Sequence, residues 1–264
     1  MAKSGVVSFA PDAKTEEKKG SLLEEEFTIN EFKNTLKCVI VDKEKNIVVN
    51  ASKDKQIKVW DLNDHASGSL KNGTPLQLFL SPYGVQSVVL TGERRNFLIA
   101  GLQGGHLWQI CLDRDPTSTN EEAYVLNNVH SKLVYPMLSL SRLKHNYVLS
   151  QGGDNTVKLW RFGEEVEYIQ CLIEFPLGEK SENPFTGVLE ELQPLSGAET
   201  SAGECFFVSS IQSKNSLDVY RILIQKEGTA ASISMIKSIS VSQAPDAVLE
   251  LAPGYVVIAI HKML

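Results

Sequence analysis

The sequence contains few cysteines and no long apolar segment. Its 264 residues include four cysteines, which lie far apart and form no CxxC pair, so redox and zinc-binding spacings are missing. No apolar run reaches the roughly 18 residues that a membrane span needs. The N-terminal stretch MAKSGVVSFAPDAKTEEKKG lacks the apolar core of a signal peptide. We therefore expect no membrane insertion and a reducing intracellular location, in the cytoplasm, the nucleus or both.

A strong charge of one sign and catalytic motifs are also missing. The chain carries 26 Lys and Arg against 32 Asp and Glu, a net charge of −6, which argues against a chain-wide basic surface for nucleic acid. There is no nucleophile elbow, phosphate-binding loop or HExxH motif, and the five histidines have no metal-ligand spacing. The glycine-rich run at 101–105 joins two expected strands, so we interpret it as a turn. We expect neither an enzyme nor a cofactor or metal site.

What the sequence does contain is a series of short strands in a repeating order. Runs of β-branched, aliphatic and aromatic residues alternate with clusters of Gly, Asn, Asp, Lys and Ser. The segments 37–62, 85–112 and 136–162 share one layout, in which two strands and a tight Gly/Asp turn precede a strand that carries tryptophan. Trp60, Trp108 and Trp160 follow one another at intervals of 48 and 52 residues. We expect each of them to head the last strand of its unit.

Two weaker units follow the three tryptophan units. The run LDVYRI places Tyr220 where tryptophan stands in the earlier units, and the final unit contains YVVIAI. We expect structural units at about 34–65, 80–113, 130–163, 186–225 and 234–264. Before them, residues 1–33 are expected to hold an N-terminal strand and a charged, flexible loop that includes KTEEKKGSLLEEE.

In the runs ASKDKQIKVWD and SQGGDNTVKLW the chain resembles the WD-repeat β-propeller family. The resemblance implies an all-β fold of four-stranded blades, with four to five blades in an incomplete or truncated ring. In the family, a Trp–Ser/Thr–His–Asp network holds each blade together. The residues of this chain that match the structural pattern are Asp54, Trp60, Trp108, His130, Asp154 and Trp160. We expect the network to be incomplete in every blade, because the first has no clear His, the second no turn Asp and the third no Asp at 141–146.

The resemblance, together with the missing catalytic groups, favours a protein-interaction scaffold in a multi-subunit complex. In the family, the loops that enter each blade line the face that partners contact, and exposed tyrosine is common at binding hot spots. The candidate partner-binding residues are Tyr83, Arg94, Arg95, Leu133 and Tyr135. The alternative is similarity to the non-catalytic propeller subunit of the tRNA guanine-7 methyltransferase, in which basic loop residues help to hold tRNA, although the net charge gives RNA binding no support. A phosphoinositide-binding propeller is a third alternative.

Overall fold

The structure is a computed structural model in which all the described elements are β-strands, as the strand pattern predicts. It describes residues 33–62, 74–92, 96–112, 124–140, 146–163, 169–177, 185–192, 201–211, 216–225, 230–241, 247–252 and 255–259. The N-terminal strand and charged loop expected at residues 1–33 lie outside the described residues, apart from Lys33.

The strands form four four-stranded antiparallel sheets and one two-stranded sheet. The first sheet contains β1 (Leu36–Asp42), β2 (Ile47–Ser52), β3 (Gln56–Asp61) and β4 (Gln77–Leu80). The second contains β5 (Val85–Thr91), β6 (Phe97–Leu102), β7 (Leu107–Cys111) and β8 (Tyr124–Leu126). The third contains β9 (Val134–Ser139), β10 (Asn146–Gly152), β11 (Thr156–Phe162) and β12 (Ile169–Pro176). The fourth contains β13 (Phe185–Leu192), β14 (Ser201–Ile211), β15 (Ser216–Gln225) and β16 (Ala231–Ser240), and the fifth β17 (Ala247–Ala252) and β18 (Tyr255–Ala259).

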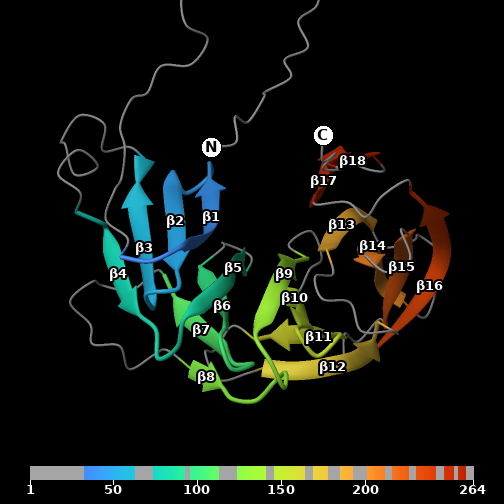
Figure 1. Cartoon of the computed structure of the whole chain (residues 1–264), viewed down its shortest axis with the longest axis horizontal. Coiled ribbons are helices and arrows are strands. Elements are labelled where there is room, and N and C mark those ends of the chain that lie inside the picture. The colour runs from blue at the N-terminus through green and yellow to red at the C-terminus, as the bar shows by residue number, and fades with distance from the viewer. Residues whose placement is uncertain are drawn as a thin grey trace, which may run out of the picture.

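The sheets follow one another along an arc (Figure 1). Their first strands contact each other in order, β1 with β5, β5 with β9, β9 with β13 and β13 with β17. Within each sheet the strands keep their sequence order, as expected when short turns join antiparallel neighbours. The described strands do not close into a ring, and the opening lies between β1 and the pair β17–β18 (Figure 1).

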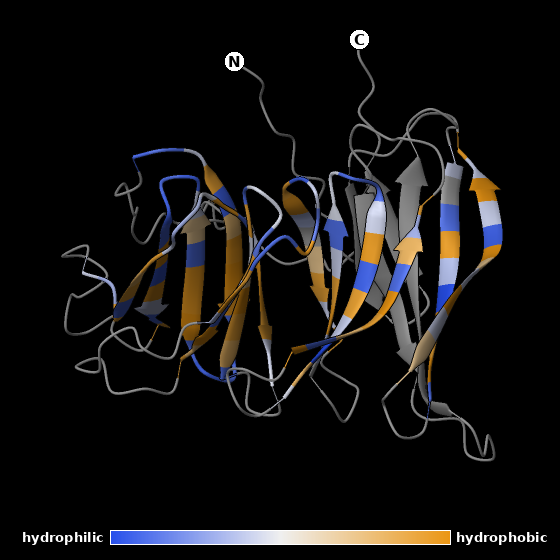
Figure 2. Cartoon of the chain, turned by 90° about the horizontal axis from the view of Figure 1, so that it is seen from below, coloured by the Kyte–Doolittle hydropathy of each residue, from blue (hydrophilic) through white to orange (hydrophobic). Residues whose placement is uncertain are grey.

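A hydrophobic core lies between each pair of neighbouring four-stranded sheets. Adjacent residues of one strand point to opposite faces, so a central strand supplies two cores at once. Leu98 of β6 belongs to the core against the first sheet, and Ile99 beside it belongs to the core against the third sheet. Leu149 of β10 and Ile222 of β15 belong to the core between the third and fourth sheets. Some strands are apolar along most of their length, while in others polar and apolar residues alternate, and several of the described turns are polar (Figure 2).

The first three sheets repeat with a strict interval of 50 residues. Lys55, Gly105 and Asn155 all have a positive φ, of 69°, 84° and 62°, and each ends the turn between the second and third strand. At the other end of these strands, Leu62 N–H donates to Asn46 O, and Leu112 N–H donates to Asn96 O, each at 2.7 Å. The equivalent residues of the third sheet, Asn146 and Phe162, face each other across β10 and β11.

This register corrects the expected position of one tryptophan. Trp60 pairs with Val48 and Trp160 pairs with Val148, whereas the residue at this position in the second sheet is Ile110, which pairs with Leu98. Trp108 lies two residues closer to the turn, opposite Ala100. The intervals of 48 and 52 residues between tryptophans therefore conceal the true interval of 50, and Trp108 fills the core against the first sheet from a different place in its strand.

The repeat predicted that each tryptophan lies in the last strand of its unit, and this prediction was wrong. The tryptophans lie in the third strand, and a fourth strand, β4, β8 or β12, pairs with it from the linker after each predicted unit. The prediction that segment 234–240 starts the fifth unit was wrong for a related reason. It belongs to β16, which pairs with β15 over its whole length because a short connection turns the chain back on itself.

Candidate functional site

The loops that enter the first three sheets are tied to the tight turns of the same sheets. Gly153 N–H, in the turn between β10 and β11, donates to Leu133 O of the loop before β9 at 2.9 Å. The same bond joins Gln103 N–H to Gly84 O at 2.8 Å in the second sheet and Lys53 N–H to Thr35 O at 3.1 Å in the first. The entry loops and the tight turns therefore lie together at the same end of the strands in each of these sheets. We call this region the entry-loop end.

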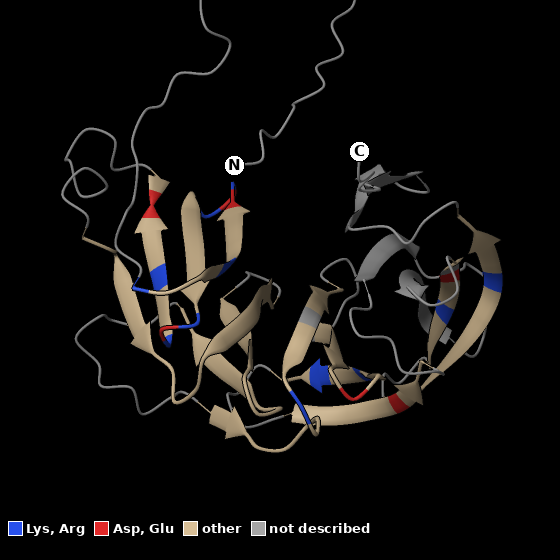
Figure 3. Cartoon of the chain, in the orientation of Figure 1, with Lys and Arg blue, Asp and Glu red and all other residues tan. Residues whose placement is uncertain are grey.

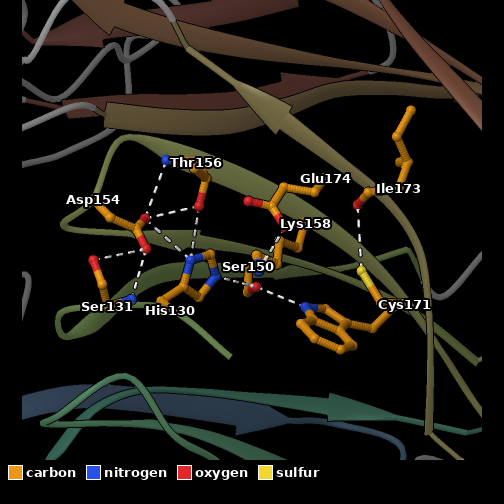
Figure 4. A network of polar contacts seen from close by, with 10 residues as sticks. His130, Ser131, Ser150, Asp154, Thr156, Lys158, Cys171, Ile173 and Glu174 are labelled. Atoms are coloured by element: carbon orange, nitrogen blue, oxygen red, sulfur yellow. Dashed lines mark hydrogen bonds and ion pairs between the residues drawn. The ribbon is translucent and has the colours of Figure 1, made fainter. Parts of the chain in front are cut away.

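A polar network centred on His130 supports this end of the third sheet (Figure 4). The His130 side chain is buried between the entry loop and the strands, with Nε2 2.9 Å from Ser150 Oγ and Nδ1 3.2 Å from Asp154 Oδ1. Trp160 Nε1–H donates to Ser150 Oγ at 2.7 Å. Because Ser150 Oγ accepts from Trp160, its own proton is free to bind Nε2 of the histidine, which leaves the Nδ1 proton for Asp154.

Asp154 links this network to the entry loop. Its Oδ2 accepts from Ser131 N–H at 2.8 Å, and its Oδ1 accepts from Thr156 Oγ1 at 2.8 Å and from Thr156 N–H at 3.2 Å. Burial raises the pKa of Asp154, but the bonds from Ser131 and Thr156 and the adjacent His130 outweigh it and lower the pKa to about 2. The carboxylate is thus ionised at neutral pH and pins the loop to the turn. Gly152 leaves the room that this needs, since a Cβ there would collide with His130 Nδ1 and Asp154 Oδ1.

The expectation that the third network lacks its aspartate was wrong. The acidic residue comes from the tight turn after β10, at Asp154, and not from the turn at 141–146. Burial lowers the pKa of His130, although the Asp154 carboxylate raises it, so the buried imidazole is neutral at pH 7. At 3% exposure, the ring has both nitrogens engaged inside the protein. His130 and Asp154 therefore serve as structural residues, the role expected from the sequence pattern.

The first sheet contains only half of this network. Asp54 holds its turn in the same way, accepting from Lys33 N–H at 3.0 Å and from Gln56 N–H at 3.2 Å. Asn50 stands at the position of Ser150, and neither its Oδ1 nor the buried Nε1 of Trp60 has a hydrogen-bond partner. The residue that precedes Lys33, where His130 precedes Ser131, is Phe32. The expected absence of the histidine in the first unit therefore agrees with the unpaired atoms beside it.

The second sheet replaces the network with apolar packing and one aromatic pair. Gly104 stands in place of the turn aspartate, and Ala100 and Ile110 occupy the positions of Ser150 and Trp160. His106 instead stacks on Tyr83 of the entry loop, with ring centroids 4.3 Å apart and an angle of 19° between the planes. Its Nδ1 also accepts from Asn128 N–H at 3.2 Å. Sequence reasoning missed this role of His106, because its separation of 23 positions from Tyr83 matches no repeat spacing.

The predicted partner-binding residues divide into those that are exposed and those outside the described part. Tyr83, Leu133 and Tyr135 are 41%, 40% and 47% exposed, so each presents an apolar or aromatic surface to solvent. Tyr83 and Leu133 come from the segments that lead into β5 and β9, in neighbouring sheets, whereas Tyr135, expected in the entry loop, is the second residue of β9 itself. Arg94 and Arg95 lie outside the described residues. Charged residues of both signs lie on the first, third and fourth sheets, whereas the strands of the second sheet carry none (Figure 3).

No protein-family model matches this chain, and a search of curated proteins found no match. Within the described ranges, no three His, Cys, Asp or Glu residues come together as metal ligands. None of the described segments is a helix long and apolar enough to cross a membrane.

Proposed function

We propose that this chain is a WD-repeat β-propeller that acts as a non-enzymatic scaffold and binds partner proteins through its entry-loop end. Four sheets of four antiparallel strands, joined through successive first strands and separated by apolar cores, support the propeller organisation. The Trp160–Ser150–His130–Asp154 network supports the assignment to the WD-repeat type.

The observation that carries the proposal is the anchored loop before β9. Asp154 and the Gly153 N–H fix the backbone of this loop at Ser131 and Leu133, while the Leu133 and Tyr135 side chains remain about half exposed. A surface group that is already ordered loses little conformational entropy when it binds, which favours affinity. Tyr83, stacked on His106, is ordered in the same way in the neighbouring sheet. The entry-loop end therefore offers ordered apolar anchors of the kind that dominate protein interfaces.

The test is quantitative affinity purification of the tagged full chain from its own cells, followed by mass spectrometry. We expect a stoichiometric set of partner proteins, and we expect Leu133→Glu/Tyr135→Glu to reduce their recovery at least tenfold, with an unchanged melting temperature. Recovery of the same partners by wild type and variant would refute the role of this surface. Recovery of no partner at all would refute the scaffold itself.

A second function, the non-catalytic subunit of an RNA-modifying complex, rests on cations at the same end. Lys53 and Lys55 in the first tight turn and Lys132 in the third entry loop are all exposed. Each phosphate contact made by such residues contributes a salt-dependent share of binding. Under this function a tRNA methyltransferase copurifies with the chain, and Lys53→Glu/Lys55→Glu or Arg94→Glu/Arg95→Glu weakens tRNA binding. Unchanged tRNA binding by both variants would exclude it.

A further inference from the structure

The exposed charges at the entry-loop end of the first three sheets are all positive within the described loops and turns. These loops and turns are 33–35, 53–55, 81–84, 103–106, 128–133 and 153–155. They contain two aspartates, Asp54 and Asp154, which are partly buried and accept from N–H groups of their own entry loops. The charged side chains left exposed are those of Lys33, Lys53, Lys55 and Lys132. This end is therefore locally positive in a chain whose net charge is −6.

The opposite end of the first sheet shows no such separation of charge. The turn between β1 and β2 carries Asp42, Lys43, Glu44 and Lys45, and both Lys43 and Glu44 are exposed. Exposed charges of both signs are the ordinary arrangement at a soluble surface. The single sign at the entry-loop end is therefore a property of that end.

Tyr83 lies beside the cations of the first tight turn. In its entry loop, Ser81 N–H donates to Lys55 O at 2.8 Å. Gly84 of the same loop packs so closely on this turn that a Cβ there would lie 3.2 Å from Lys53 O. Tyr83, 41% exposed, stands between these two contact points in the sequence. Its ring and the two lysines therefore belong to one continuous surface.

On the side of the third sheet, Tyr83 is linked to the next entry loop. Its ring stacks on His106 with 4.3 Å between the centroids, and His106 Nδ1 accepts from Asn128 N–H at 3.2 Å, at the start of that loop. Lys132 and Leu133 lie farther along the same loop, and both are exposed. An aromatic ring and an aliphatic side chain thus alternate with cations across three sheets.

The length of this row fits a short extended segment. Sheets that pack face to face lie about 10 Å apart, so a row over three sheets spans about 20 Å. An extended chain rises about 3.3 Å per residue, and about six residues therefore cover the row.

We propose that the entry-loop end of the first three sheets binds an acidic peptide segment of a partner protein. Its carboxylates contact Lys53, Lys55 and Lys132, and an apolar side chain between them contacts Tyr83 and Leu133. Complementary charge of this kind speeds association and selects the partner, while the apolar anchors supply affinity. This assignment rests on the scaffold function proposed above and names the chemistry of the partner.

The composition of the row favours a peptide over RNA. Leu133 lies between the cations and has no flat ring on which a base stacks. The described loops and turns of this end also contain no arginine, the residue whose planar fork binds phosphate in two places at once. Lysines and an aliphatic anchor match carboxylates and an apolar side chain.

The first experiment is a selection from a random dodecapeptide phage library against the immobilised full-length chain. We expect the enriched peptides to carry Asp or Glu on both sides of an aromatic or aliphatic residue. The peptide that is enriched most is then labelled with fluorescein and titrated with the full-length chain in fluorescence anisotropy.

Two matched charge reversals locate the binding surface in this titration. Lys53→Glu/Lys55→Glu should weaken binding at least tenfold, because it reverses the charge beside Tyr83. Lys43→Glu/Lys45→Glu makes the same change in net charge at the opposite end of the same sheet, and its affinity should stay within twofold of wild type. If the first variant melts early, Lys53→Gln/Lys55→Gln replaces it, with at least a threefold loss of affinity expected.

Three results would overturn this assignment. The first is a selection that enriches no peptide, or only peptides without Asp and Glu. The second is an equal loss of affinity in the two charge reversals, which would trace binding to net charge alone. The third is tighter binding of a single-stranded oligouridylate than of the selected peptide, with a loss in Lys53→Glu/Lys55→Glu, which would assign the row to RNA. If copurified partners still depend on Leu133 and Tyr135 in the first two cases, the scaffold function stands and only the acidic peptide is refuted.

Discussion

Replacing Asp154 by asparagine tests whether the buried network holds the third sheet and its entry loop together. The carboxylate accepts from Ser131 on one oxygen and from Thr156 and His130 on the other. An asparagine keeps a single acceptor oxygen and turns an N–H toward one of these two sets of donors. A hydrogen bond to a charged group contributes about 1.5–3 kcal/mol to stability. The asparagine loses the bonds from one of the two sets of donors, and the bonds from the other set no longer reach a charged acceptor. We therefore expect the free energy of unfolding to fall by about 3 kcal/mol.

Asp54→Asn provides the matched control for this experiment. Asp54 occupies the same place in the first tight turn, but within the described residues its side chain accepts from two backbone N–H groups, those of Lys33 and Gln56, and from no histidine. Because Lys33 is exposed, water replaces a lost bond there, and we expect a loss of about 1 kcal/mol. The difference of about 2 kcal/mol between the two variants measures what the side-chain network adds to the turn itself.

The assay is urea unfolding at pH 7, followed by tryptophan fluorescence, together with hydrogen exchange of the Ser131 and Gly153 amides, which donate to Asp154 and to Leu133 O. The Asp154→Asn variant should unfold at lower urea and exchange these two amides faster, while Asp54→Asn leaves their exchange unchanged. Equal losses in the two variants, to within about 0.5 kcal/mol, would refute the reasoning, because the bonds of His130 and Thr156 would then contribute nothing.

Three further perturbations test the rest of the framework. Trp160→Ala should cost about 3–5 kcal/mol in urea unfolding, because it opens a cavity between two sheets and leaves Ser150 without its donor. Gly105→Ala should cost about 3 kcal/mol in the same assay, since φ is +84° and a Cβ would collide with His130 O. Burial lowers the pKa of His130, so the unfolded chain binds its proton first as the pH falls; urea midpoints at pH 7.5 and 5.5 should show stability dropping below about pH 6.5.

The strand order of the central sheets follows from the sequence, whereas their outer strands do not. β2, β3, β6 and β7 are buried on two faces and read as apolar runs between turn residues, which is a strong signal. β4 and β8 are four and three residues long and only partly buried, so nothing in their composition separates them from the linkers that contain them. Their position becomes apparent only through their hydrogen bonds to the third strand.

The equivalence of Tyr220 to the tryptophans could be predicted and is confirmed by the strand register. The pairing of β15 with β16 shifts between Val219 and Tyr220, and the pairing of β11 with β12 shifts at the same place, between Leu159 and Trp160. Tyr220 also packs edge-on against Phe175 of the third sheet. A large aromatic residue that follows an alternating strand pattern was a sufficient signal here, because its size, and not its N–H, is what the core requires.

The partners of the buried polar groups could not be predicted in the same way, because the contacts join residues 10 to 26 positions apart on separate elements. The three sheets also differ at the position of Trp160. The third sheet has a hydrogen-bonded tryptophan there, the second has an apolar residue, and the first has a tryptophan whose N–H is unpaired. Ile110 packs in the core between the first and second sheets, but its apolar side chain makes no hydrogen bond to the entry loop. The His130 network, in contrast, stabilises the third sheet and also holds its entry loop through Ser131. Under the proposed function, the sheet that needs an ordered loop is the one that retains the full network. On that proposal we expect the strongest partner contacts at Leu133 and Tyr135, and not at the corresponding loop of the first sheet, whose network ends in two unpaired atoms.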